Sequence, residues 1–258
     1  MLPSRRALLV VAATLAVTLA GALAGAGCRR GRSGTVKIAA ASDLANAFEE
    51  LGALYAKRTG VEPVFTFGSS GLLAKQLEQG APYAVFAAAN QSYVDGLVAA
   101  GRCDPASKRL YARGRLAVWS RREAVDRLSD LAGPAFRKIA IANPEHAPYG
   151  IAARQALLAS ELWDDVQGKL VYAENVRQAM QWAQDGQADA AIVALSLATV
   201  TEGGRSMNVN PALHAPLDQA AAVCGEGKAA ADGARFLELL ASPEGKEIMQ
   251  RYGFLAPE

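Results

Sequence analysis

TVKIAAASDLANAFEELGALYAKRTG, which spans residues 35–60, joins two patterns that meet at Ser42. Residues 35–41 form an apolar run with the length of a strand, and Ser42-Asp43 is a polar pair of the kind that opens a helix. Apolar residues then recur at helical spacing until Gly60, which is a plausible stop. The stretch therefore predicts a strand followed directly by an amphipathic helix, the repeating unit of α/β folds.

The same alternation continues along the chain. Further strands are expected at residues 61–67, 83–88, 116–120, 138–142 and 190–194, and further helices at 72–78, 91–100, 151–160, 176–185, 229–240 and 244–251. Alternating strands and helices imply parallel sheets with helices on both faces. In such sheets, ligands bind at the carboxyl ends of the strands, so a binding site is expected among the loops that follow the strands.

The composition is that of a globular protein that can bury a core. Of the 258 residues, 51% are hydrophobic and 20% are charged. The net charge of +2 falls to about zero if an N-terminal segment carrying Arg5 and Arg6 is removed, which argues against a nucleic-acid partner. After that segment, no apolar stretch reaches the ~20 residues that span a bilayer.

Residues 1–27 have the order of a secretory signal peptide, with a basic start, an apolar middle and a region of small residues. A retained signal anchor is the alternative. Residues 4–9 also resemble a twin-arginine export signal, although paired arginines are common in ordinary signals. Cleavage after Ala26 would release a soluble product. Cleavage before Cys28 would produce a lipoprotein, and we favour it although Gly25 stands where Leu is usual.

Cys103 and Cys224 are the other two cysteines. In an oxidising compartment they could form a disulfide bond, but sequence does not show proximity. Two separately buried cysteines are the preferred interpretation.

Four loops share one feature, a small polar or peptide-rich segment that opens a helix: Ser42-Asp43, Ser69-Ser70-Gly71, Pro148-Tyr149-Gly150 and Asn175-Val176. A helix N-terminus offers unpaired N–H groups and the positive end of a dipole, which favour an anion. For either serine alone, capping of its own helix is the alternative. None of the four loops contains Lys, so together they could hold a tetrahedral dianion through neutral donors.

Six segments carry a resemblance to a known family: residues 39–44, 67–71, 80–82, 143–150, 174–177 and 251–254. In their order and spacing, the chain from about Val36 to Phe254 resembles the molybdate-binding proteins of bacterial molybdate ABC transporters. The resemblance implies an α/β, two-lobed periplasmic-binding-protein fold of type II with a hinge, each lobe a mixed sheet flanked by helices. It also implies the domain organisation: signal peptide 1–27, tether 28–33, lobe 1 from 34–112 and 216–258, and lobe 2 from 113–215.

The resemblance assigns ligand-binding roles to four residues. Ser42 and Ser70 match the donors of the first lobe, Tyr149 matches a second-lobe contact, and Val176 matches a backbone N–H donor at a helix start. Many relatives carry a ligand-binding Tyr where this chain has Ala194, so we expect the Tyr149 hydroxyl to replace that phenol. Molybdenum is expected only as the oxyanion, without direct protein ligands.

The function implied is capture of molybdate or tungstate outside the cytoplasm and delivery to a membrane permease. We expect a monomer that needs no cofactor and touches the membrane only through a lipid anchor at Cys28. Within binding proteins, sulfate or phosphate is the alternative ligand, and phosphate would gain support if Asp43 faced the site. A hydrolase is the alternative of another class, but the chain lacks the G-x-S-x-G spacing around Ser70 and has only two histidines, His146 and His214.

Overall fold

The computed structural model describes residues 34–257. The signal peptide predicted at 1–27, the tether at 28–33 and the acylated Cys28 lie outside the described residues. Within residues 34–257, no helix is both long enough and apolar enough to cross a membrane.

The first sheet has five strands in the order β2-β1-β3-β10-β4. They are β1 (Thr35–Ala41), β2 (Glu62–Gly68), β3 (Val85–Ala88), β4 (Arg109–Gly114) and β10 (Leu217–Val223). β1 pairs in parallel with β2 and β3, whereas β10 pairs antiparallel with β3 and β4. Pro63 lies on β2, which is an edge strand as its proline predicts.

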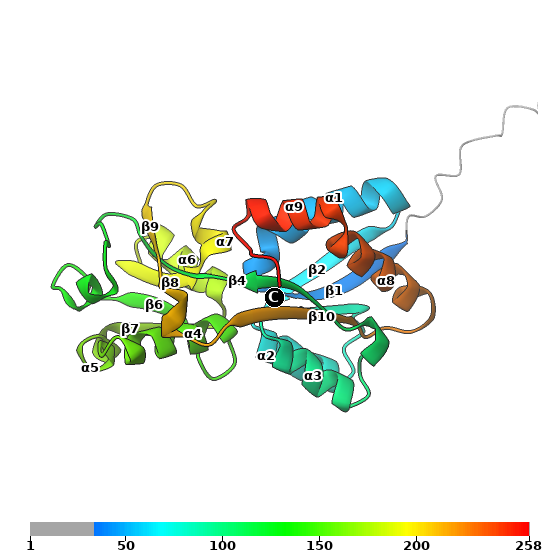
Figure 1. Ribbon diagram of the computed structural model, residues 1–258, viewed down its shortest axis with the longest axis horizontal. Coiled ribbons are helices and arrows are strands. Elements are labelled where there is room, and N and C mark those ends of the chain that lie inside the picture. The colour runs from blue at the N-terminus through cyan, green and yellow to red at the C-terminus, as the bar shows by residue number, and fades with distance from the viewer. Residues whose placement is uncertain (1–33, 258) are drawn as a thin grey trace, which may run out of the picture. The chain divides into compact units, whose positions relative to one another are not determined.

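Helices cover both faces of this sheet (Figure 1). α1 (Ala45–Thr59), α8 (Gly227–Ala241) and α9 (Pro243–Arg251) lie on one side, and α2 (Ser70–Glu78) and α3 (Gln91–Ala99) lie on the other. Because side chains alternate along a strand, β1 supplies Ile38 to one apolar cluster and Ala39 to the other. α1 ends at Thr59, and the next residue is the predicted stop Gly60, whose positive φ of 69° is a conformation that glycine adopts easily.

The second sheet has the order β7-β6-β8-β5-β9. Its strands are β5 (Leu116–Ser120), β6 (Ile139–Ala142), β7 (Leu170–Ala173), β8 (Ala190–Ala194) and β9 (Arg205–Asn208). The helices around it are α4 (Pro148–Ala159), α5 (Trp163–Val166), α6 (Val176–Gln184) and α7 (Leu195–Ala198). Short 3₁₀ turns complete the two layers: η1 (Ser42–Leu44), η2 (Pro105–Ser107), η3 (Leu128–Ala132), η4 (Gln167–Lys169) and η5 (Pro211–Leu213).

The chain passes between the sheets twice. It leaves the first sheet after β4, enters the second at β5 with only Arg115 between them, and returns by β10. The alternating pattern by itself implied parallel sheets, but both sheets are mixed, as the family resemblance implied, because β10 and β5 run antiparallel to their neighbours. The alternating pattern could not indicate this, because β4, β7, β9 and β10 were not predicted as strands.

The cysteine interpretation is also wrong. Cys103 and Cys224 form a disulfide bond. Cys103 precedes β4 and Cys224 directly follows β10, and β4 and β10 are neighbours in the first sheet. The antiparallel pairing that brings the cysteines together was the part of the fold that the sequence pattern missed.

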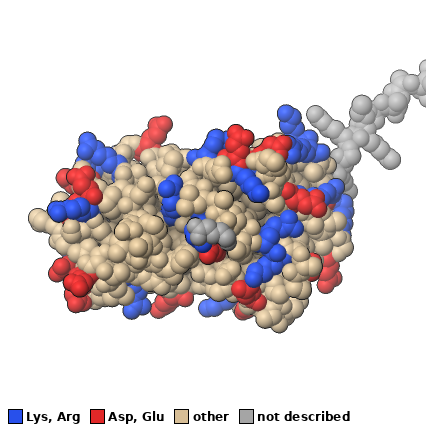
Figure 2. Space-filling model, in the orientation of Figure 1, with Lys and Arg blue, Asp and Glu red and all other residues tan. Residues whose placement is uncertain are grey.

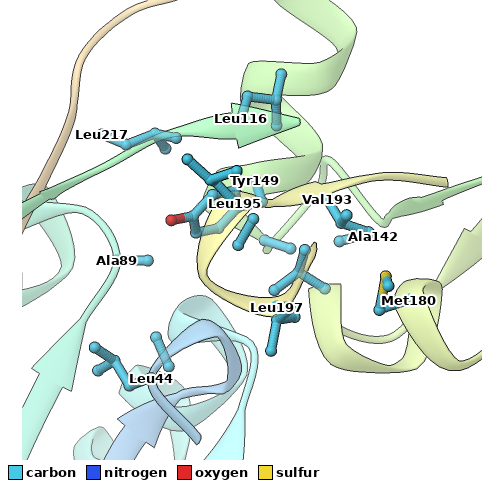
Figure 3. Packing of buried hydrophobic residues seen from close by; sticks show 14 of the residues in the cluster. Leu44, Ala89, Leu116, Ala142, Tyr149, Met180, Val193, Leu195, Leu197 and Leu217 are labelled. Atoms are coloured by element: carbon cyan, nitrogen blue, oxygen red, sulfur yellow. The ribbon is translucent and has the colours of Figure 1, made fainter. Parts of the chain in front are cut away.

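One apolar cluster runs from the first sheet into the second (Figure 3). Leu44 and Ala89 come from loops of the first sheet, and Tyr149 and Leu195 come from elements of the second. The loops that the sequence singled out are therefore packed against one another.

Candidate anion site between the two sheets

The four predicted loops line a single pocket. Its lining residues are Ala41, Ser42, Asp43, Gly68, Ser69, Ser70, Ala89, Ala147, Pro148, Tyr149 and Val176. The pocket has room for about one water molecule, whose centre can occupy about 10 Å³ of it. A five-atom oxyanion is larger, so the loops must separate to admit it.

Both predicted serines are buried, and both hydroxyl oxygens accept a bond from a backbone N–H. Ser70 Oγ accepts from Ala89 N at 3.0 Å, and Ser42 Oγ accepts from Arg177 N at 3.5 Å. Neither side chain caps its own helix. Because a hydroxyl has one hydrogen to donate, both serines keep that hydrogen for another acceptor.

Tyr149 and Val176 stand at helix starts. Val176 is the first residue of α6, behind Asn175, whose side chain caps the helix by accepting from Gln178 N. Tyr149 follows Pro148, the first residue of α4. Backbone N–H groups in a first helical turn have no partner within the helix, so both positions present N–H donors at this end of the sheets.

Hydrogen bonds join loops of the first sheet to loops of the second around the pocket. Ser69 Oγ lies 2.8 Å from His146 Nδ1 and donates to His146 O at 2.6 Å, and Gly71 N donates to the same carbonyl at 3.0 Å. On the other side, Ser196 Oγ donates to Asp43 O at 2.8 Å. The two sheets are therefore held in a closed arrangement.

A buried polar cluster lies beside the pocket and was not found by sequence reasoning. Gln219 Nε2 donates to Asp43 Oδ2 at 2.6 Å and contacts the Tyr149 hydroxyl at 3.3 Å. The Tyr111 hydroxyl donates to Gln219 Oε1 at 2.8 Å. Tyr111 and Gln219 lie on β4 and β10, the strands beside the two crossings. A Cβ on Gly114 would lie 2.2 Å from the Tyr149 hydroxyl, so glycine leaves room for this cluster.

Asp43 carries the site's unbalanced charge. The residue is 1% exposed, and its Oδ1 has no hydrogen-bond partner among the described residues. Burial raises the pKa of this carboxyl to about 6, although the hydrogen bond from Gln219 lowers it. Burial also raises the pKa of the Tyr111 and Tyr149 phenols, which therefore stay protonated at neutral pH.

Two other features bear on the sequence predictions. Ala194 is buried at the end of β8 and is not among the residues that line the pocket.

A hollow of about 510 Å³ lies elsewhere, between β4 and the C-terminal segment, and contains none of the four predicted residues. Within residues 34–257, no group of three or more His, Cys, Asp or Glu side chains is placed to hold a metal ion.

Basic and acidic side chains are interspersed on the face shown in Figure 2, and neither sign forms a continuous band there. That face has no stripe of the kind that follows a nucleic-acid backbone.

Comparison with known families identifies the fold's relatives. The family of bacterial extracellular solute-binding proteins matches residues 36–255. The chain belongs to this family. Its members bind solutes outside the cytoplasm, and the predicted fold of two mixed sheets flanked by helices is confirmed.

Three relatives show how far the likeness of this solute-binding protein extends. The molybdate-binding protein ModA of Rhodobacter capsulatus is 34% identical, over 86% of this chain and 89% of the relative. YvgL of Bacillus subtilis, whose name places it among ABC transporter substrate-binding lipoproteins, is 30% identical over 90% of this chain and 93% of its own. The solved structure of the periplasmic molybdate-binding protein of Azotobacter vinelandii matches with a TM-score of 0.82 and 31% identity, covering 86% of this chain and all of that one.

Proposed function

We propose that this solute-binding protein captures molybdate, or the closely similar tungstate, in the pocket between the two sheets and delivers it to the permease of an ABC transporter. The observation that carries the proposal is the convergence of Ser42, Ser70, Tyr149 and Val176 on one pocket. The names of its relatives supply the ligand and the transporter class.

The donors of the pocket are suited to a fully deprotonated tetrahedral dianion. The two serine hydroxyls have already accepted a bond, so each has its hydrogen to give. Hydrogen bonds to a charged group contribute about 1.5–3 kcal/mol each, so several of them offset the cost of desolvating the anion. No Lys or Arg lines the pocket, which leaves the dipoles of the helix starts and the neutral donors to balance the charge.

Phosphate is the second candidate ligand, and Asp43 is the observation that favours it. A carboxylate oxygen without a partner could accept the proton that phosphate carries at neutral pH. Sulfate has no such proton and gains nothing from this oxygen.

Calorimetric titration of the purified protein with molybdate, tungstate, sulfate and phosphate tests the ligand. We expect tight binding of molybdate and tungstate and a matching rise in melting temperature, because a ligand that binds only the folded state stabilises it. Equal shifts with sulfate and molybdate would contradict the proposal, and a preference for phosphate would support the second candidate.

The lobes and the hinge belong to the same proposal. We assign lobe 1 to residues 34–112 and 216–258 and lobe 2 to residues 113–215, with opening and closing about the two crossings beside β4 and β10. The small size of the pocket supports this, since an oxyanion enters only if the lobes separate. Small-angle scattering with and without molybdate should show a more compact protein in the bound state.

Export and anchoring rest on the N-terminal sequence. We propose that residues 1–27 are removed and that Cys28 is lipidated, as the apolar run that ends at Gly27-Cys28 indicates. Mass spectrometry of the native protein distinguishes the outcomes. An intact N-terminus would refute processing, and a cleaved but unmodified Cys28 would refute only the anchor.

A further inference from the structure

We propose that Asp43 makes anion capture proton-linked, so that the site takes up a proton with each oxyanion and Oδ1 of Asp43 holds it. The inference rests on the proposed function, because it concerns the same pocket and uses molybdate as its probe.

The geometry places a carboxyl group where a dianion is to be bound. Asp43 lines the pocket, is 1% exposed and has one oxygen, Oδ1, without a partner. The other oxygen is held by Gln219 Nε2 at 2.6 Å. A carboxylate and a dianion buried together repel each other strongly, since little water is present to screen them. Protonation of Oδ1 removes this repulsion and turns an unpaired acceptor into an O–H donor.

Among residues 34–257, no basic side chain bonds to the Asp43 carboxyl and could take over this task. The titratable groups that face the carboxyl are the phenols of Tyr111 on β4 and Tyr149 on α4, and α7 presents only the Ser196 hydroxyl to the Asp43 carbonyl. Arg177 of α6 lines a separate surface hollow. The charged side chains of α1 and β2, which pack against η1, lie toward the surface: Glu49, Glu50, Lys57 and Arg58 on α1 and Glu62 on β2.

Without ligand, the carboxyl is mostly ionised at neutral pH, because its pKa of about 6 lies below that pH. The bound dianion raises the pKa further, so a proton enters from solvent as the anion binds. Binding should therefore weaken by about tenfold for each pH unit between about pH 6.5 and 8, and it should lose this dependence once the free carboxyl is itself protonated.

Calorimetry with sodium molybdate in buffers of different ionisation enthalpy counts the protons directly. At about pH 7.5 we expect uptake of nearly one proton by the wild-type protein and none by Asp43→Asn, whose amide oxygen can still accept from Gln219. The affinity of Asp43→Asn should not vary with pH over the same range. Tight wild-type binding without proton uptake would overturn the inference and leave the proposed function standing.

His146 is the histidine beside the pocket, and it supplies the matched control. Its ring contacts Ser69 Oγ, a contact that His146→Gln can retain. Proton uptake should persist in His146→Gln. If His146→Gln lost the proton uptake and Asp43→Asn retained it, the histidine and not Asp43 would hold the proton, and the assignment would be overturned. Because proton uptake is measured on the wild-type protein, this part of the test does not depend on whether the variants fold. Absence of any heat with molybdate would overturn the proposed function, and this inference with it.

Discussion

At the scale of single residues, the pocket combines neutral donors with one buried acid. Ser42 and Ser70 each accept a backbone bond that leaves their own hydrogen available, which is a more specific arrangement than helix capping. Asp43 follows Ser42 in the sequence and yet contributes the opposite property, an unpaired acceptor. Ligand binding can therefore be tested at Ser42, and the pH dependence of stability at the adjacent Asp43.

The Tyr149 hydroxyl can be tested by Tyr149→Phe, which keeps the ring and removes the oxygen. If the hydroxyl donates to the dianion, the affinity for molybdate should fall by about 1.5–3 kcal/mol, roughly ten- to a hundredfold, as measured by calorimetry. Ser70→Ala should cost a similar amount and serves as the comparison. Unchanged affinity in a folded Tyr149→Phe would mean that the hydroxyl serves only the cluster with Gln219 and Asp43.

The raised pKa of Asp43 predicts how the stability of the ligand-free protein depends on pH. The folded state holds the Asp43 proton more tightly than the unfolded state, in which the pKa is near 3.8. The stability that this protonation contributes is therefore fully present below pH 3.8 and is lost as the pH rises through about 6. The loss is about 3 kcal/mol for a shift of this size. Urea unfolding from about pH 4 to 8 should show the decline in the wild type and its absence in Asp43→Asn. Parallel curves for the two proteins would contradict the prediction.

At the scale of elements, the local sequence pattern predicted those helices and strands whose formation depends on neighbouring residues. The strand–helix unit at residues 35–60, the stop at Gly60 and the start of α6 follow from periodicity, capping and turn chemistry, whereas α4 begins at Pro148, before the helix expected at 151–160. β10 was missed because its sequence, LDQAAAV, is dominated by alanine, which has little strand preference, and is interrupted by Gln219. The polar residue that hid the strand is the one that reaches Asp43.

The contact between α2 and the loop before α4 can be tested through a pair of glycines. A Cβ on Gly71 would lie 2.7 Å from the His146 carbonyl, whereas Gly96 in α3 has no atom within 4 Å of such a Cβ. Gly71→Ala should therefore push the loops apart, lower stability by about 1–3 kcal/mol and weaken molybdate binding. Gly96→Ala should raise stability by about 0.5–1 kcal/mol and leave binding unchanged. Thermal unfolding and calorimetry decide, and equal effects of the two changes would refute the role given to this contact.

At the scale of the whole molecule, the features that escaped sequence reasoning are those made by residues far apart in the chain. Asp43 and Gln219 are separated by 176 positions, and the bonded cysteines by 121. No local pattern contains such pairings, because they depend on the chain leaving the first sheet and returning to it. The resemblance to solute-binding proteins implied that path but not which side chains would meet along it.

The disulfide bond follows the same path and yields the last prediction. Cys103 precedes β4, by which the chain leaves the first sheet, and Cys224 follows β10, by which it returns, so the bond closes a loop that contains the entire second sheet. Closing a loop of this length restricts the unfolded chain, and its loss typically costs about 2–4 kcal/mol. The bond lies at the ends of β4 and β10 that are remote from the crossings, and neither cysteine lines the pocket. We therefore expect the Cys103→Ser, Cys224→Ser double variant to unfold at lower urea concentration while its molybdate affinity, measured below the unfolding transition, changes less than twofold (~0.4 kcal/mol). A large loss of affinity without loss of stability would instead show that the bond positions the two strands beside the hinge.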